Sequence, residues 1–135
     1  MRVCYTWSYM KSIAKKILIV EDDTAISKVL QLKFQNAGFE VITCGDGKVC
    51  MATLNKETFD LVILDLILPE VDGFAVLERL KRDWKSAPPV VVFSNLCQTA
   101  DIKRAKDLGV IAYCTKIVTD LYDLFQIVKE ILVRG

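Results

Sequence analysis

Three short runs of the chain are apolar along their whole length: ILIV at residues 17–20, LVIL at 61–64 and VVVF at 90–93. A strand with one face in water alternates apolar and polar residues, whereas a strand covered on both faces is apolar throughout. A stretch with helical spacing of apolar residues follows the first run, over residues 25–37, and Gly38 marks its end. The pattern therefore predicts buried strands with helices packed on both faces of their sheet.

The same alternation continues along the rest of the chain. We expect strands at residues 17–20, 41–44, 60–65, 90–94 and 111–115. We expect helices at about residues 25–37, 48–55, 73–84, 99–108 and 120–133, with a turn at 45–47. Strands that alternate with helices in this way form parallel sheets. The predicted fold class is α/β: a (βα)5, doubly wound, five-stranded parallel sheet in a flavodoxin-like three-layer sandwich.

The length of 135 residues allows one well-buried domain and is too short for two ordinary ones. We assign residues 15–135 to that domain. Residues 1–14 lie outside the alternating pattern, and we expect them to form a mobile N-terminal extension. Met10 opens the segment MKSIAKKILIV, which is typical of a natural start, so we expect residues 1–9 to be an addition upstream of it.

The chain contains no histidine, which excludes a histidine-based hydrolase triad, a histidine metal site and a histidine phosphocarrier. Any chemistry must therefore use carboxylates, Lys, Ser, Thr, Tyr or Cys. The five cysteines, at positions 4, 44, 50, 97 and 114, are odd in number and form no C-x-x-C pair. This usage favours reduced thiols and a cytoplasmic location.

Charge and hydropathy give no reason to expect a nucleic-acid or membrane partner. The formal net charge is +1, and charged residues interrupt every apolar stretch well before the roughly 18 residues that a membrane span needs. Basic residues do gather at 81–82 and at 103–106. We expect these to be solvated faces of helices.

Polar residues follow four of the five predicted strands. Glu21 and Asp22 follow the first, Asp65 ends the third, Ser94 ends the fourth and Lys116 follows the fifth. Carboxyl ends of parallel strands meet at one edge of the sheet, where ligands bind. Converging carboxylates repel one another, and a hard divalent cation such as Mg²⁺, which takes oxygen ligands, removes that cost. A lysine and a hydroxyl beside them suit a phosphoryl group.

A second interpretation of the strand-end acids is purely structural. Acids after a parallel strand often cap the next helix, and we expect Asp23 or Thr24 to do so here. Composition and spacing alone leave both interpretations open.

Four segments closely resemble receiver domains of response regulators, in the chemotaxis-regulator-like superfamily of two-component signal transduction: KILIVEDD, DLVILDLILPEVDGF, VVVFSN and GVIAYCTK. The resemblance covers about residues 15–134. Its most specific part is the D-x-x-x-P-x-x-D-G arrangement of Asp65, Pro69, Asp72 and Gly73.

The resemblance implies that Asp65 is the phosphoacceptor in a phosphorelay. The donor would be a phosphohistidine on a sensor histidine kinase or a histidine phosphotransfer protein. The chain would then catalyse only its own aspartyl phosphorylation and dephosphorylation and would not be an enzyme with a separate substrate. Lys116 and Ser94 would contact the phosphate.

The resemblance also implies a metal site for Mg²⁺ or Mn²⁺. Asp22, Asp65 and the backbone carbonyl of Ile67 would bind the ion directly, and Glu21 would bind it through a water molecule.

In the family, phosphorylation moves a switch hydroxyl and a switch aromatic, which the resemblance places at Ser94 and Tyr113. The change would alter a partner-binding face built from the helix at 99–108, the strand at 111–115 and the helix at 120–133. A homodimer through this face would be compatible with the family, and the output target is not readable from the sequence.

Four residues depart from the family pattern. Ile117 follows the lysine where proline is usual, so a cis peptide bond is not expected there. Asn95 follows the switch serine, where a smaller residue is common, and would narrow access to Asp65. Ile67 and Leu96 are apolar at positions that flank the phosphoryl group. Because neither side chain can orient a water molecule, we expect slow self-dephosphorylation.

Three other functions share the architecture. A haloacid-dehalogenase-like phosphatase also uses an aspartyl nucleophile and Mg²⁺, but it needs a second acid where Ile67 stands. In a flavodoxin-like FMN carrier, the first strand would lead into a Ser/Thr/Gly-rich loop in place of the acids at 21–23. The third is a receiver-like interaction module that no longer takes phosphate.

Overall fold

The computed structural model describes residues 14–83 and 87–134. Apart from Ala14, the extension predicted at 1–14 lies outside the described residues. The strands are β1 Lys16–Val20, β2 Glu40–Cys44, β3 Leu61–Leu64, β4 Val90–Ser94 and β5 Ala112–Thr115. The helices are α2 Thr24–Asn36, α3 Gly47–Lys56, α4 Gly73–Arg82, α5 Thr99–Asp107 and α6 Leu121–Arg134.

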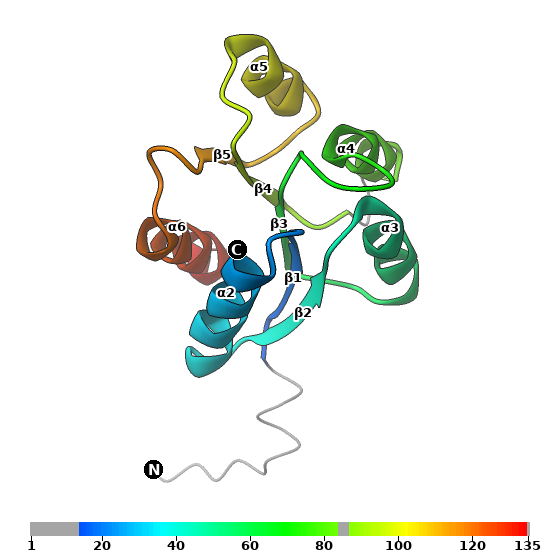
Figure 1. Cartoon of the computed structure of the whole chain (residues 1–135). Coiled ribbons are helices and arrows are strands. Elements are labelled where there is room, and N and C mark those ends of the chain that lie inside the picture. Colours follow the sequence, from blue (N-terminus) through cyan, green and yellow to red (C-terminus); the bar gives the residue numbers. More distant parts are fainter. Residues whose placement is uncertain (1–13, 84–86, 135) are drawn as a thin grey trace, which may run out of the picture.

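The strands form one parallel sheet in the order β2-β1-β3-β4-β5. Helices α2 and α6 cover one face, and α3, α4 and α5 cover the other (Figure 1). The predicted fold class is therefore confirmed. Strand order reverses between β1 and β3. In sheets of this kind ligands bind beyond the carboxyl ends of the strands at such a point.

Two apolar cores, one on each face of the sheet, hold the layers together. Along β1, Ile17 and Ile19 point to the face covered by α2 and α6, whereas Leu18 and Val20 point to the opposite face. All four side chains are at most 1% exposed. Complete burial on both faces explains why the run at residues 17–20 is apolar at every position.

Aspartate side chains lie at the start of four of the helices. Asp23 accepts hydrogen bonds from the backbone at the start of α2, Asp46 does so for α3, Asp72 for α4 and Asp120 for α6. Such caps satisfy amide groups that a helix cannot pair internally. The structural interpretation is thus correct for Asp23. The cap at Asp46 also makes Gly47 the first residue of α3, one residue earlier than predicted.

The described cysteines are free thiols, as predicted. Cys44, Cys50 and Cys114 are buried and act as small core residues, while Cys97 is exposed. Over residues 14–83 and 87–134, no helix has both the length and the apolar character to cross a bilayer.

Candidate functional site

The backbone ladder of the sheet continues one residue beyond three of the strands. The Asp65 amide donates to the Val20 carbonyl at 3.0 Å, and the Glu21 amide donates to the Cys44 carbonyl at 3.0 Å. These bonds place the first residue after β1 beside the first residue after β3. The predicted acids therefore meet at the carboxyl edge because of the register of the sheet.

An acidic cluster of Glu21, Asp22 and Asp65 lies at this edge. One carboxylate oxygen from each residue lies within 4.8 Å of those of the other two. Glu21 and Asp65 are each only 5% exposed, whereas Asp22 faces solvent. Three carboxylates at this spacing are able to share one small cation.

Lys116 supplies the positive charge that this cluster needs. Its ammonium group donates to Asp65 Oδ2 at 2.9 Å and also pairs with Glu21 Oε1. The Lys116 amide donates to the Ser94 carbonyl at 2.9 Å, which continues the β4–β5 ladder and directs the residue to the same edge. The lysine side chain is 12% exposed, so water weakens these contacts little.

The other oxygen of Asp65 is held by two neutral donors. The Ser94 hydroxyl, which is fully buried, donates to Asp65 Oδ1 at 2.7 Å. The Ile67 amide donates to the same oxygen at 3.0 Å. Together with Lys116, these donors fix the orientation of the carboxylate.

The charges in the cluster displace the pKa values of its members. Burial raises the pKa of Glu21, and the Asp65 carboxylate raises it further, to about 7, against the opposing effect of Lys116. Burial alone would raise the pKa of Asp65, but Glu21 and Lys116 lower it below its usual value. Hydrogen bonds from Ile67 and Ser94 add to that decrease. Asp65 is therefore the member of the pair that stays ionised.

One further observation supports a divalent cation at the acidic cluster. Glu21 Oε2 is buried and has no hydrogen-bond partner within the described part of the chain. An unpaired buried oxygen is costly. A cation at the cluster, or a water molecule bound to that cation, would satisfy it.

The predicted switch residues lie next to the cluster. Tyr113 on β5 is half-buried, and its hydroxyl donates to the Leu96 carbonyl at 2.7 Å. The Leu96 amide in turn donates to the Ser94 hydroxyl at 3.3 Å. Tyr113 and Ser94 are thus connected through one loop residue.

Exposed apolar side chains follow Asp65 and Lys116 closely in the chain. Ile67 is 50% exposed, and Ile117 and Val118 are 72% and 79% exposed. No peptide bond over residues 14–83 and 87–134 is cis, so Ile117 follows Lys116 in trans, as predicted.

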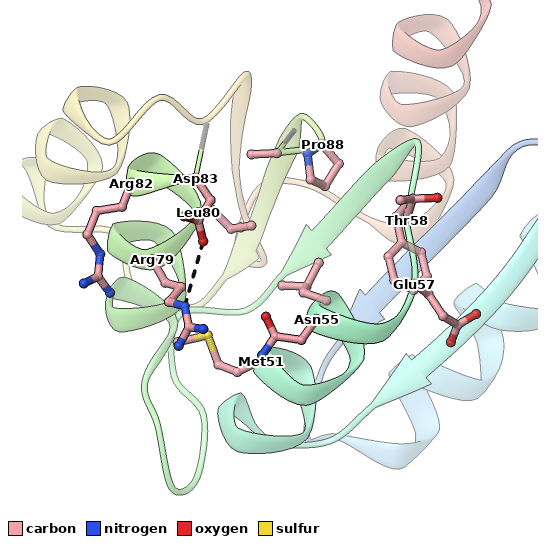
Figure 2. A pocket seen from close by; sticks show the side chains of 12 residues that line it. Met51, Asn55, Glu57, Thr58, Arg79, Leu80, Arg82, Asp83 and Pro88 are labelled. Atoms are coloured by element: carbon pink, nitrogen blue, oxygen red, sulfur yellow. Dashed lines mark ion pairs between the residues drawn. The ribbon is translucent and has the colours of Figure 1, made fainter. Parts of the chain in front are cut away.

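A separate pocket lies at the amino edge of the sheet, between the C-terminal ends of α3 and α4 (Figure 2). It has a volume of about 540 Å³, and its lining includes Met51, Arg79 and Pro88. None of the predicted site residues line it. The acidic cluster is therefore separate from this pocket.

Two features of the site were not predicted from the sequence. Lys116 was expected to contact a phosphate but not Glu21, and no local signal gives the direction of such a long side chain. Gly47 was expected in a turn, although this residue contacts the loop that follows Asp65. A glycine at the start of a helix, where glycine is unfavourable, could have drawn attention to it.

Comparisons with known proteins agree with this geometry. The family model described as response regulator receiver domain matches residues 17–129. The DNA-binding dual master transcriptional regulator RpaA of Synechocystis sp. is 38% identical over 120 residues, which are 88% of this chain and 49% of that protein. The chain thus spans about half the length of this relative.

Two solved structures are similar in both fold and sequence. The phosphorylated cyanobacterial phytochrome response regulator RcpA is 40% identical with a TM-score of 0.75, covering 87% of this chain and 91% of that one. The Mn²⁺-bound form of response regulator Rcp1 is 36% identical with a TM-score of 0.73, again covering 87% and 91%.

The raised pKa of Glu21 predicts a pH dependence of stability in buffer containing EDTA. The folded protein holds this proton up to pH about 7, whereas the unfolded chain releases it near 4.5. Glu21 therefore contributes stability that is complete below the lower value and lost as the pH rises through the higher one. Urea unfolding at a series of pH values should show that the free energy of unfolding of the wild type decreases as the pH rises. The decrease should be less steep in Glu21→Gln. Glu130→Gln, an exposed control, should keep the wild-type slope, and an equally steep slope in Glu21→Gln would contradict the prediction.

Proposed function

The chain belongs to the response regulator receiver domain family of two-component systems, and we propose that it takes a phosphoryl group from a partner phosphohistidine onto Asp65. One observation carries the proposal. An ionised, oriented carboxylate at Asp65 lies beside two more acids and a lysine, at the edge of the sheet where ligands bind. The switch hydroxyl Ser94 contacts the same carboxylate.

The metal in this proposal is Mg²⁺ or Mn²⁺. Asp22, Asp65 and the Ile67 carbonyl would bind it directly, and Glu21 through water. The acidic cluster and the Mn²⁺-bound form of the similar Rcp1 support a divalent ion. When bound, the ion neutralises charge on the transferring phosphoryl group.

The residues of the chain carry out the transfer. A carboxylate oxygen of Asp65 attacks the phosphorus, an O–P bond forms, and the N–P bond to the donor imidazole breaks. The bonding electrons stay on the imidazole nitrogen, which takes up a proton. Lys116 balances the negative charge that arrives, and the Ser94 hydroxyl turns to donate to a phosphoryl oxygen. Because the chain has no histidine, the donor must be another protein or domain.

The output of the domain would follow from the movement of Ser94. Once the hydroxyl leaves Asp65, the Leu96 loop and the Tyr113 hydroxyl lose their present arrangement. The face formed by α5, β5 and α6 would then change, which alters binding of a target or of a second copy. We propose the cytoplasm as the location, in agreement with the free thiols.

The receiver domain itself is proposed to bind no nucleic acid and no membrane. Two of the three basic residues of α5 are paired with acids: Arg104 with Glu78 at 2.8 Å, and Lys103 with Asp107 at 3.6 Å. The DNA-binding activity in the name of RpaA belongs to that protein.

Phosphorylation is tested with acetyl phosphate and Mg²⁺, read out as the mass of the intact protein. The wild type should gain one phosphoryl group, and Asp65→Asn should gain none because the amide is not a nucleophile. Asp107→Asn removes an exposed acid at the opposite end of α5 and should behave as the wild type. Phosphoryl uptake by Asp65→Asn would refute the assignment.

Mg²⁺ binding separates the roles of two adjacent acids. Asp22→Ala should nearly abolish binding and leave the fold intact, since this side chain is exposed and forms no hydrogen bond within residues 14–83 and 87–134. Asp23→Ala should keep Mg²⁺ affinity and lose about 1 kcal/mol of stability with its helix cap. Calorimetric titration and urea unfolding measure both quantities, and unchanged Mg²⁺ affinity in Asp22→Ala would show the ligand assignment to be wrong.

The apolar side chain of Ile67, two residues after Asp65, predicts slow loss of the phosphoryl group. Ile67 offers no hydrogen bond to an attacking water, whereas Ile67→Asn does, so the variant should lose its phosphoryl group faster. The decay of the phosphorylated mass after removal of the donor measures this rate. A wild-type half-life of seconds, unchanged in Ile67→Asn, would disprove the idea.

A further inference from the structure

We infer that Gly47, on a helix that supplies none of the proposed ligands, is a positioning residue for the metal site. It would act by giving space to the β3–α4 loop (residues 65–72), which contains the Ile67 carbonyl. The inference rests on the proposed function, because that function makes the carbonyl a metal ligand.

The first observation is a close approach of backbones. A Cβ atom at Gly47 would lie 1.7 Å from the Val71 carbonyl oxygen and 2.6 Å from the Val71 carbonyl carbon. Both are backbone atoms, so no side-chain rotation could relieve the overlap. Any residue other than glycine would therefore push the loop away from α3.

Conformation does not account for the glycine. Positive φ angles occur at Gly38 and Gly109 but not at Gly47, which lies in the first turn of α3. A residue with a side chain would suit that helical position better. Space is thus the reason for glycine here.

Two backbone hydrogen bonds hold the loop. Next to α3, the Gly47 amide donates to the Pro69 carbonyl at 3.4 Å. At its far end, the Gly73 amide donates to the Leu66 carbonyl at 3.0 Å. Between them Glu70 has a φ of 67°, a strained conformation for a residue with a side chain. Such strain persists only where the surroundings enforce it.

Through these contacts, the position of the loop links Gly47 to the proposed metal site. Ile67 lies between the ladder bond of Asp65 and the contact made by Pro69. If the loop moves outward at Val71, the Ile67 carbonyl turns away from Asp22 and Asp65. Residues that orient metal ligands typically change metal affinity by about 10–100-fold when they are replaced.

The test compares two glycines of the same segment. Gly47→Ala should raise the Mg²⁺ dissociation constant by about 10–100-fold, measured by calorimetry well below the unfolding temperature. Gly45→Ala is the matched control, because a Cβ there meets nothing closer than the Glu21 carbonyl oxygen at 3.9 Å. Its affinity should equal that of the wild type. A residue that only supports packing would lower the unfolding temperature without changing affinity in the folded protein.

A double variant covers the case in which Gly47→Ala does not fold. Gly47→Ala with Glu70→Gly leaves the loop free to shift away from the new methyl group, so it should fold and still bind Mg²⁺ weakly. Glu70→Gly alone keeps the glycine at position 47 and should bind Mg²⁺ more tightly than the double variant.

The outcomes separate two failures. If the wild type binds no Mg²⁺, the proposed function fails. If it does bind, and folded Gly47→Ala or the double variant binds as Gly45→Ala does, only the positioning role is overturned. It is also overturned if neither variant folds, because the glycine then supports the fold as a whole.

Discussion

The ammonium group of Lys116 lies between two nearly buried carboxylates, Glu21 and Asp65. Two acids removed from water at this distance would not both ionise without a positive partner. The lysine lets Asp65 remain an anion while Glu21 keeps a raised pKa. Under the proposed function, this charge balance serves the nucleophile, the cation and the phosphoryl group. The cation would add positive charge to the cluster, and the phosphoryl group would add negative charge.

The balance is possible because backbone geometry, and not side-chain length, brings the groups together. Ladder bonds one residue beyond β1, β3 and β5 place Glu21, Asp65 and Lys116 at one edge. In addition, α3 approaches the β3–α4 loop closely, where Gly47 contacts Pro69 and Val71. The exposed acid Asp22 completes the cluster from the solvent side.

Much of this was predictable from the sequence. The uninterrupted apolar runs predicted the layers, and strand-end positions alone brought Asp65, Ser94 and Lys116 to the correct edge. Two things were not predictable. The pairing of Lys116 with Glu21 as well as Asp65 depends on the direction of a long side chain, and the contact of Gly47 with Val71 depends on how two segments distant in sequence pack. Both arise from tertiary packing, which no local pattern records.

The ladder bonds at the carboxyl edge have a consequence for folding. A shift of one strand by a single residue turns its side chains to the opposite face. Such a slip in β3 would replace Asp65 by an apolar neighbour, and the pairs that define the register connect segments far apart in the chain, which form late. Partly folded forms therefore lack the cluster of Glu21, Asp22 and Asp65 altogether. Under the proposed function, a copy with a misregistered sheet would be silent instead of wrongly active.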